Sequence, residues 1–313
     1  MSEERALDEV SKELWQRAAN NEGSIRADAY VALGQMAFDQ GKFKESLAFC
    51  ETAKEIFEQE SKSEYQREIF DVNVGISKNY EKLERSQEAA QAMGIAIEAA
   101  KVIEIEELDD LLRDQGRYWF SAGQYENSIA CHQEAIVQTQ MFLHEESFGI
   151  DYFNIGMGLF ELGRYQESID AYLKSRAAFK ASDEVASAVD CDIRLAENYA
   201  ELKEPINVIH YGQRALDFFT VLDDYRKIWT LKYFLGCAHH LLGDNETAGR
   251  LLDEARNLAQ AMGWKEWEFL IKVDEELAKI YEANLMHAEA AEIRRRVATV
   301  KELAAKDVTD EAA

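Results

Sequence analysis

Paired glycines divide this chain into units of similar length. The two glycines of each pair are separated by six residues, and the first members of successive pairs stand 82, 40 and 80 residues apart. These intervals are near-multiples of 40, and a fixed period of 20 to 50 residues is typical of solenoids built from stacked supersecondary units. The sequence therefore predicts a unit that recurs about every 40 residues. The pairs are Gly34/Gly41, Gly116/Gly123, Gly156/Gly163 and Gly236/Gly243.

Aligning the whole chain on this period gives three columns of small residues. Nineteen of the 21 positions hold Gly, Ala or Ser. Helices approach each other most closely where small side chains meet, so the columns predict helix-to-helix contacts. Column one contains Gly34, Ser77, Gly116, Gly156, Ala196, Gly236 and Ala278. Column two contains Ser46, Ala89, Ser128, Ser168, Val208, Ala248 and Ala290. Column three contains Ala53, Ala96, Ala135, Ser175, Ala215, Ala255 and Val297.

Each unit has the pattern of a helical hairpin. Pro205 is the single proline of the 313 residues, and no stretch shows the alternation and turn signals of strands. The second glycine of each pair lies between two runs with helical apolar spacing, where a left-handed residue ends the first helix. Glu84 and Lys203 take this place in the second and fifth units, and Pro205 can begin the next helix. We therefore predict an all-α fold.

The same residues resemble the tetratricopeptide repeat (TPR). The resemblance rests on the recurring small columns, on Leu33-Gly34, Ile155-Gly156 and Leu235-Gly236, and on GRYWFSAGQYENSIACHQEAI and YFNIGMGLFELGRYQESIDAYLKS. It covers roughly residues 25–300. The period is about 40 instead of the usual 34, and the closing proline is missing, as in the long repeats of kinesin light chains, LGN-type adaptors and Rap-type regulators. The resemblance implies a right-handed α-solenoid of about seven hairpins.

The two ends of the chain are expected to differ from the middle. Residues 1–24 are predicted to form a capping helix, residues 25–307 the solenoid, and residues 308–313 a frayed tail. The last helix carries a basic run, interpreted as a solvated face. The apolar side of the capping helix comprises Ala6, Val10, Leu14, Trp15 and Ala18, and the basic run is Arg294, Arg295 and Arg296.

Composition argues against several kinds of function. With 60 acidic and 35 basic residues the net charge is −25, which disfavours nucleic-acid and membrane-surface binding. No run of 18 apolar residues and no secretory signal is present, and the four cysteines form no Cys-x-x-Cys pair. The six histidines lack metal-site spacing, and no nucleophile or phosphate-loop motif occurs. We expect a cytoplasmic, non-enzymatic protein without metal or cofactor.

A basic cluster is predicted in the groove that the first helices line. Lys78/Lys82 and Arg113/Arg117 are each spaced i,i+4, so each pair shares one helix face. Four cations there would seat a carboxylate, either an acidic side chain or the C-terminus of a bound peptide. The alternative is internal pairing with acidic neighbours, namely Glu81, Glu84, Asp110 and Asp114.

A second set of predicted groove residues is apolar or polar. Aromatic side chains anchor many protein interfaces, although at helical spacing they also occur in cores. Asn154 matches the place where many TPR proteins hydrogen-bond the backbone of a bound peptide. The set is Phe120, Phe153, Asn154, Met157, Phe160, Tyr233 and His240.

The leading functional hypothesis is an adaptor that holds a protein or peptide segment in this groove. One alternative is a Rap-type regulatory receptor that a short peptide switches. Another is a structural subunit of a larger assembly, with self-association possible.

Overall fold

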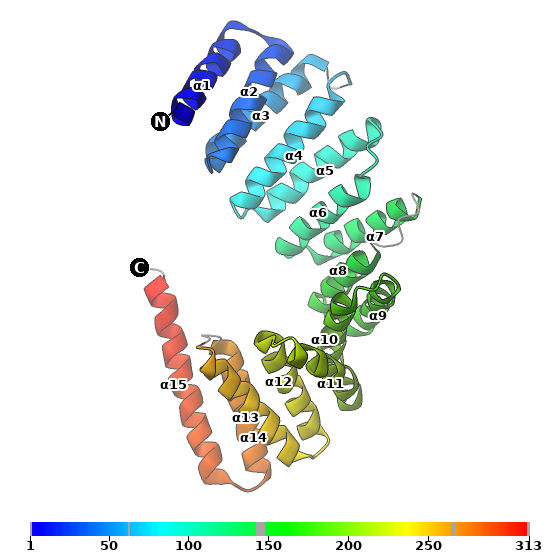
Figure 1. The fold of residues 1–313 in the computed structure, drawn as a ribbon, viewed down its shortest axis with the longest axis vertical. Helices are drawn as coiled ribbons and strands as arrows, with labels where there is room; N and C mark the ends of the chain where they lie inside the picture. The colour runs from blue at the N-terminus through cyan, green and yellow to red at the C-terminus, as the bar shows by residue number, and fades with distance from the viewer. Residues whose placement is uncertain (1, 62, 142–147, 264–266, 312–313) are drawn as a thin grey trace. The chain divides into compact units, whose positions relative to one another are not determined.

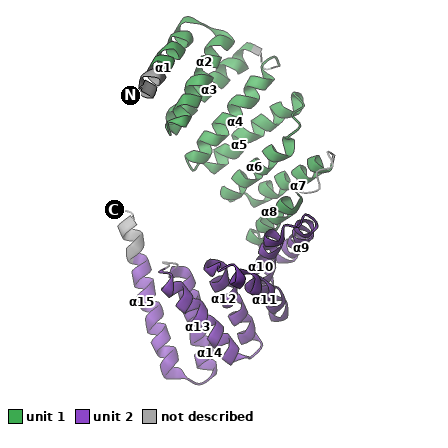
Figure 2. Ribbon diagram, viewed as in Figure 1, with its two compact units in different colours: residues 1–162 green, residues 163–313 purple. Residues whose placement is uncertain are grey.

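The regular secondary structure of the chain is helical. The computed structural model describes residues 2–61, 63–141, 148–263 and 267–311, which contain fifteen α-helices and no strand (Figure 1). The chain divides into two compact units, residues 1–162 and 163–313 (Figure 2). The predicted all-α fold is confirmed.

Unit 1 contains one single helix, then three hairpins, and ends with one further helix. Helices adjacent in the chain pack against each other from α1 to α8. The helices are α1 (Ser2–Asn20), α2 (Gly23–Asp39), α3 (Phe43–Ser61), α4 (Gln66–Lys82), α5 (Ser86–Val102), α6 (Leu108–Ser121), α7 (Tyr125–Met141) and α8 (Phe148–Glu161).

Unit 2 begins with one helix and continues with three hairpins. Each helix of this unit packs against the next, and α12 also contacts α10. The first helices of the seven repeats begin at residues 23, 66, 108, 148, 185, 225 and 267, which confirms the period of about 40. The helices of unit 2 are α9 (Tyr165–Ala181), α10 (Val185–Glu201), α11 (Pro205–Val221), α12 (Tyr225–Leu241), α13 (Asn245–Ala261), α14 (Trp267–Ala283) and α15 (His287–Glu311).

The turns inside the hairpins share one backbone conformation. Gly41 has φ = 73°, its N–H donates to the carbonyl of Phe38, and the N–H of Lys42 donates to that of Ala37. This pair of bonds satisfies carbonyls that the helix end leaves unpaired. Glu84 (φ 58°) and Lys203 (φ 57°) adopt the same left-handed conformation, so these hairpins form without glycine, as expected.

Leu285 occupies this conformation at the turn between α14 and α15, with φ = 61° and its side chain 78% exposed. A left-handed backbone conformation is unfavourable by about 1–2 kcal/mol for a residue with a Cβ. Because the side chain of Leu285 is exposed, its removal loses little buried apolar surface. We expect Leu285→Gly to raise the free energy of unfolding by about 0.5–1 kcal/mol after the greater chain entropy of glycine is included. Thermal and urea unfolding check this; a destabilised variant would contradict it.

The small columns lie where the helices of a hairpin meet. All seven residues of column two and all seven of column three are buried. A Cβ added to Gly116 would stand 2.8 Å from His132 Nε2, and one added to Gly236 would stand 2.7 Å from Leu252 Cγ. Larger side chains in column one would therefore separate the two helices of the hairpin, as the sequence pattern predicted.

The terminal helices differ in part from the ends expected from the sequence. Trp15 on α1 packs edge-on against Tyr30 and Phe49, with ring centroids 6.4 and 5.5 Å apart. At the other end, α15 runs to Glu311, so the first part of the expected tail at 308–313 is helical. Arg296 also differs from the solvated face expected of the basic run, because it pairs with the fully buried Asp274.

The cysteines behave as small hydrophobic residues. Cys50, Cys131 and Cys191 are buried free thiols, and burial raises the pKa of each to about 11. Burial also raises the pKa of Cys237 to about 12. Raised pKa values keep the thiols protonated and unreactive at neutral pH.

Candidate functional site

Five of the predicted groove residues line one pocket of unit 1, here called pocket B. It has a volume of about 380 Å³ and lies among α6, α7 and α8. The other five lining residues, which include Ser128, His132 and Ile150, were not among the predicted groove residues. The lining comprises Arg113, Asp114, Arg117, Phe120, Ser121, Ser128, His132, Ile150, Asn154 and Met157.

A smaller pocket of unit 1, pocket A, occupies the equivalent place two repeats earlier. Its volume is about 150 Å³, and it lies among α2, α3 and α4. Lys78 is the predicted groove residue that lines it. The lining comprises Val31, Gly34, Gln35, Phe38, Ser46, Cys50, Asp71, Val72, Gly75, Lys78 and Asn79.

The two pockets correspond residue by residue in the repeat. Phe38 and Phe120 both stand four residues after the column-one glycine. Each packs edge-on against the aromatic residue that opens the next helix, with ring centroids 5.3 Å apart in both cases. The other matched pairs are Ser46 with Ser128, Cys50 with His132, Gly75 with Asn154, and Lys78 with Met157. The same pocket therefore occurs in two repeats, which line it with different side chains.

One buried polar atom of pocket B, the Oγ of Ser128, has no hydrogen-bond partner in the described part of the chain. A buried hydroxyl without a partner loses its hydrogen bonds to water and gains none in return. The half-buried amide of Asn154 lines the same pocket. A ligand placed in the pocket can therefore bond to both side chains.

Arg113 is held by carboxylates, which is the alternative considered for the basic cluster. Its guanidinium donates to Asp151 at 3.0 Å, to Asp109 at 2.9 Å and to Asp110 at 2.7 Å. It also donates to Thr139 Oγ1 at 2.9 Å. Burial lowers the pKa of Arg113, but the bond to Asp151 and the three negative charges outweigh this and raise it. Arg113 therefore has its charge satisfied before any ligand binds.

Asp151, which lies on α8, also fixes the histidine at the floor of pocket B. It is fully buried and accepts a hydrogen bond of 2.9 Å from His132 Nδ1. A buried carboxylate requires such partners, since an unpaired charge is strongly disfavoured in the interior. Arg113 on α6 and His132 on α7 are thus joined to α8 through one carboxylate.

Arg117 remains half-exposed at the rim of pocket B. Its guanidinium donates to Glu81 Oε1 at 2.5 Å and to Asp114 at 3.2 Å. Burial of Glu81 opposes its ionisation, but the bond and charge of Arg117 outweigh this and lower the pKa of Glu81. An exposed ion pair of this kind contributes only about 0–1 kcal/mol to stability, so Arg117 can exchange its partner for a group of a ligand with little loss of free energy.

The two lysines of the predicted cluster are the accessible cations. Lys78 is exposed at the edge of pocket A and makes no ion pair with any described residue. Lys82 is exposed one turn further along α4, and its charge helps lower the pKa of Glu81. The structure therefore separates the four predicted cations into two accessible lysines and two paired arginines.

The other predicted residues do not line pocket A or pocket B. Phe153 and Phe160 are half-buried on α8. Tyr233 and His240 lie on α12 in unit 2. Tyr233 packs against Phe269 at 5.2 Å between ring centroids, and His240 Nδ1 is 2.8 Å from Asn245 Oδ1. These two side chains thus contact neighbouring helices of unit 2.

Within residues 2–61, 63–141, 148–263 and 267–311, no three His, Cys, Asp or Glu residues are placed to hold a metal ion. None of the helices described is both long and apolar enough to cross a bilayer.

Hairpins of this kind, stacked with recurring hollows along their first helices, define a helical-repeat solenoid. The family model of the tetratricopeptide repeat matches residues 26–62, which contain most of the first hairpin. The structure repeats this hairpin along the chain, so the match supports a solenoid of tetratricopeptide-like repeats. No curated protein sequence matches the chain.

Solved structures with this fold share little sequence with the chain. The TPR sensor-containing signal transduction ATPase of the STAND class from Pyrococcus horikoshii has a TM-score of 0.66 at 14% identity. The match covers 90% of this chain and 43% of the ATPase, so this chain spans less than half of that protein. The apo form of RapI has a TM-score of 0.55 at 14% identity, covering 90% of this chain and 99% of RapI.

A third similar structure contains the TPR-like repeats of a putative kinesin light chain from Podosopora anserina. Its TM-score is 0.51 at 14% identity, and the match covers 65% of this chain and 98% of that one. At such identities these likenesses concern the fold. They agree with the long-repeat solenoids that the sequence pattern resembles.

Proposed function

We propose that this chain is a non-enzymatic scaffold that holds an extended polypeptide segment along the first helices of unit 1. The recurrence of one pocket at equivalent places two repeats apart carries this proposal. A ligand that fills two equivalent pockets needs a group for each pocket at a suitable separation. An extended polypeptide meets this need, because its side chains project at regular intervals along the backbone. Pockets of about 150 and 380 Å³ suit individual side chains.

The lining of each pocket indicates what it accepts. Pocket B offers Phe120, Ile150 and Met157 to an apolar side chain, while Asn154 and Ser128 can bond the peptide backbone. Pocket A presents Lys78, which suits an acidic side chain or a terminal carboxylate. We assign the carboxylate seat to Lys78 and Lys82, because the carboxylates around Arg113 already neutralise it.

Affinity capture from the lysate of the source cells, read by mass spectrometry, tests the proposal. Wild type is compared with Met157→Glu, which puts a charge into pocket B, and with Lys78→Glu in pocket A. We expect each to weaken capture of the same partner about tenfold or more, as loss of a central interface contact does. Lys44→Glu is the matched control, because Lys44 is exposed on α3 and lines neither pocket.

Equal capture by wild type and both pocket variants would contradict this assignment. Helical content of every variant is checked by circular dichroism, so that loss of binding is not confused with loss of fold. A peptide-switched receptor and a structural subunit are the alternative hypotheses. A partner peptide that changes the small-angle scattering profile would favour the first, and ligand-independent self-association the second.

A further inference from the structure

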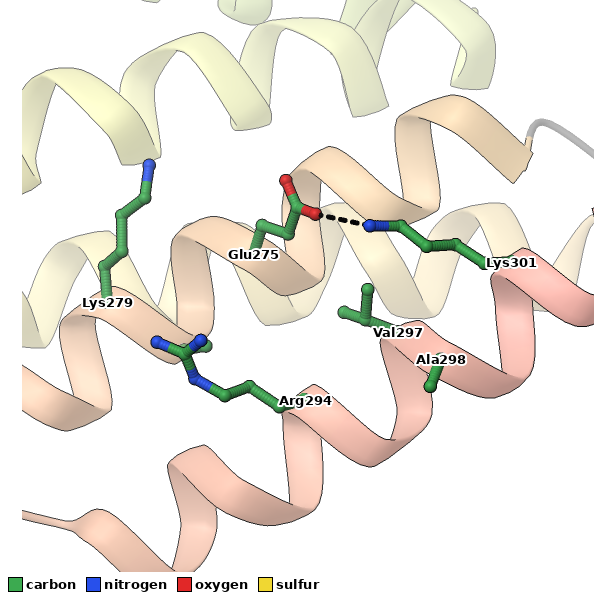
Figure 3. Close-up of a pocket in the computed structure, with 7 residues that line it drawn as sticks. Glu275, Lys279, Arg294, Val297, Ala298 and Lys301 are labelled. Atoms are coloured by element: carbon green, nitrogen blue, oxygen red, sulfur yellow. Dashed lines mark hydrogen bonds and ion pairs between the residues drawn. The ribbon is translucent and has the colours of Figure 1, made fainter.

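The last hairpin of unit 2 has a pocket on the face where a following helix would pack. This end pocket has a volume of about 410 Å³ and lies between α14 and α15 (Figure 3). Among the described residues no helix covers it. Its lining comprises Glu275, Ala278, Lys279, Arg294, Val297, Ala298 and Lys301.

The repeat shows what occupies the equivalent face of the preceding hairpin, α12–α13. Tyr233 corresponds to Glu275, since both stand three residues before column one, and Tyr233 packs against Phe269 of α14. Arg256 corresponds to Ala298, since both follow column three, and Arg256 Nε pairs with Asp274 of α14 at 2.8 Å. The equivalent face is therefore covered by the first helix of the next hairpin.

At two further equivalent positions, the residues of α13 are apolar and those of α15 are basic. Leu252 is buried in a cluster with Leu277 of α14, and Ala259 in a cluster with Leu270. The corresponding residues of α15 are Arg294 and Lys301, whose side chains are 62% and 57% exposed. Two positions that are buried and apolar on α13 are thus exposed and positively charged on α15.

We propose that the end pocket binds an acidic amphipathic helix of a partner protein, in the place that α14 takes on the preceding hairpin. Leu277 and Leu270 of α14 share buried clusters with Leu252 and Ala259, the residues of α13 that are equivalent to Arg294 and Lys301. The two leucines stand seven residues apart on one helix face. The bound helix therefore carries an acidic residue, an apolar residue three positions later, and a second acidic residue seven positions after the first. The apolar residue packs on Val297 and Ala298.

The existing ion pairs of the pocket do not block this. Arg294 donates to Glu282 at 2.6 Å and Lys301 to Glu275 at 3.1 Å, both on the exposed surface, as Figure 3 shows for the second pair. Exposed pairs are weak, so carboxylates of a bound helix can replace them. The acidic helix α1 of a second copy does not fit, because none of its acidic residues stand seven positions apart.

Fluorescence anisotropy with a labelled, capped alanine-rich helix tests the proposal. The probe carries glutamate, leucine and glutamate at the stated spacing, and its partner probe carries lysine for both glutamates. The full chain should bind the glutamate probe about tenfold more tightly, since two attractive charge pairs become repulsive in the other probe. The double variant Arg294→Glu/Lys301→Glu should reverse this preference, and Arg295→Glu, exposed on the same helix but outside the pocket, should preserve it.

Retention of the wild-type preference by the double variant, or equal weakening by Arg295→Glu, would overturn the proposal. If the double variant loses helical content, the milder Arg294→Gln/Lys301→Gln pair replaces it and should abolish the preference. Sedimentation velocity is run in parallel. Self-association that the double variant abolishes would identify a second copy as the occupant and would overturn the partner assignment.

Discussion

Replacing Asp151 with alanine is expected to lower the free energy of unfolding of unit 1 by about 3–5 kcal/mol. Asp151 is fully buried on α8 and accepts hydrogen bonds from Arg113 of α6 and His132 of α7. Alanine leaves a mostly buried guanidinium and a buried imidazole without their shared acceptor. Removing one partner of a buried pair is costly because the other charge stays desolvated.

Hydrogen exchange of the amides in α6, α7 and α8 measures this effect locally, since repeat proteins can unfold in parts. Asp110→Ala is the matched control. Asp110 pairs with the same arginine at 2.7 Å, but its side chain is 73% exposed, so its removal should change stability by at most about 1 kcal/mol. Similar effects of the two variants would show that burial does not decide the strength of this network.

Asp274→Ala in unit 2 should also lower the free energy of unfolding by about 3–5 kcal/mol. Both carboxylate oxygens of this buried residue accept from arginines, Arg256 Nε at 2.8 Å on one side and Arg296 Nε at 2.8 Å on the other. Asp192 has a similar position in an earlier repeat, with Arg176 at 2.7 Å and Arg214 at 3.4 Å. The variant leaves two arginines on neighbouring helices repelling each other.

The control for Asp274 is the adjacent Glu275→Ala, which removes an exposed ion pair and should have an effect of at most about 1 kcal/mol. A triple variant with Asp274→Leu, Arg256→Met and Arg296→Met should recover most of the lost stability. Apolar residues of similar size often replace a buried ion pair without loss. Urea unfolding with hydrogen exchange of α13–α15 checks both expectations; a triple variant as unstable as Asp274→Ala would contradict the second.

The hairpins could be predicted from the sequence because their determinants are local. Gly41 ends a helix through its own backbone, and the glycines of column one act on a helix that follows within 20 residues. The same turn and small-residue positions recur in successive repeats, which strengthens the prediction of each hairpin. The same logic identified Glu84 and Lys203 as turn residues without glycine.

The candidate site was predicted less completely, because its electrostatics depend on residues distant in the chain. Arg113 has acidic neighbours in sequence, but its deepest partner, Asp151, lies 38 residues away on another helix. Arg296 and Asp274 are likewise 22 residues apart, so the basic run of α15 resembled a solvated face. The buried hydroxyl of Ser128 belonged to column two, where a small residue is already explained by helix packing.

These networks also bear on how the site works. In unit 1 the carboxylate of Asp151 fixes Arg113 and His132, two residues that line pocket B. A rigid lining reduces the ordering that a bound peptide must impose, so less binding free energy is lost on association. Lys78 and Lys82 of α4 remain exposed, and in the proposed complex they would attract an acidic group of the ligand.

A single polypeptide segment is proposed to occupy both pockets of unit 1. Site-specific photocrosslinking tests this most directly, with benzoylphenylalanine placed at Met157 in pocket B, at Lys78 in pocket A, or at the control position Lys44 on α3. We predict that both pocket positions crosslink to a single continuous segment of the same partner, and that Lys44 does not. Crosslinks from Lys44 alone, or from the two pockets to unrelated segments, would contradict the account.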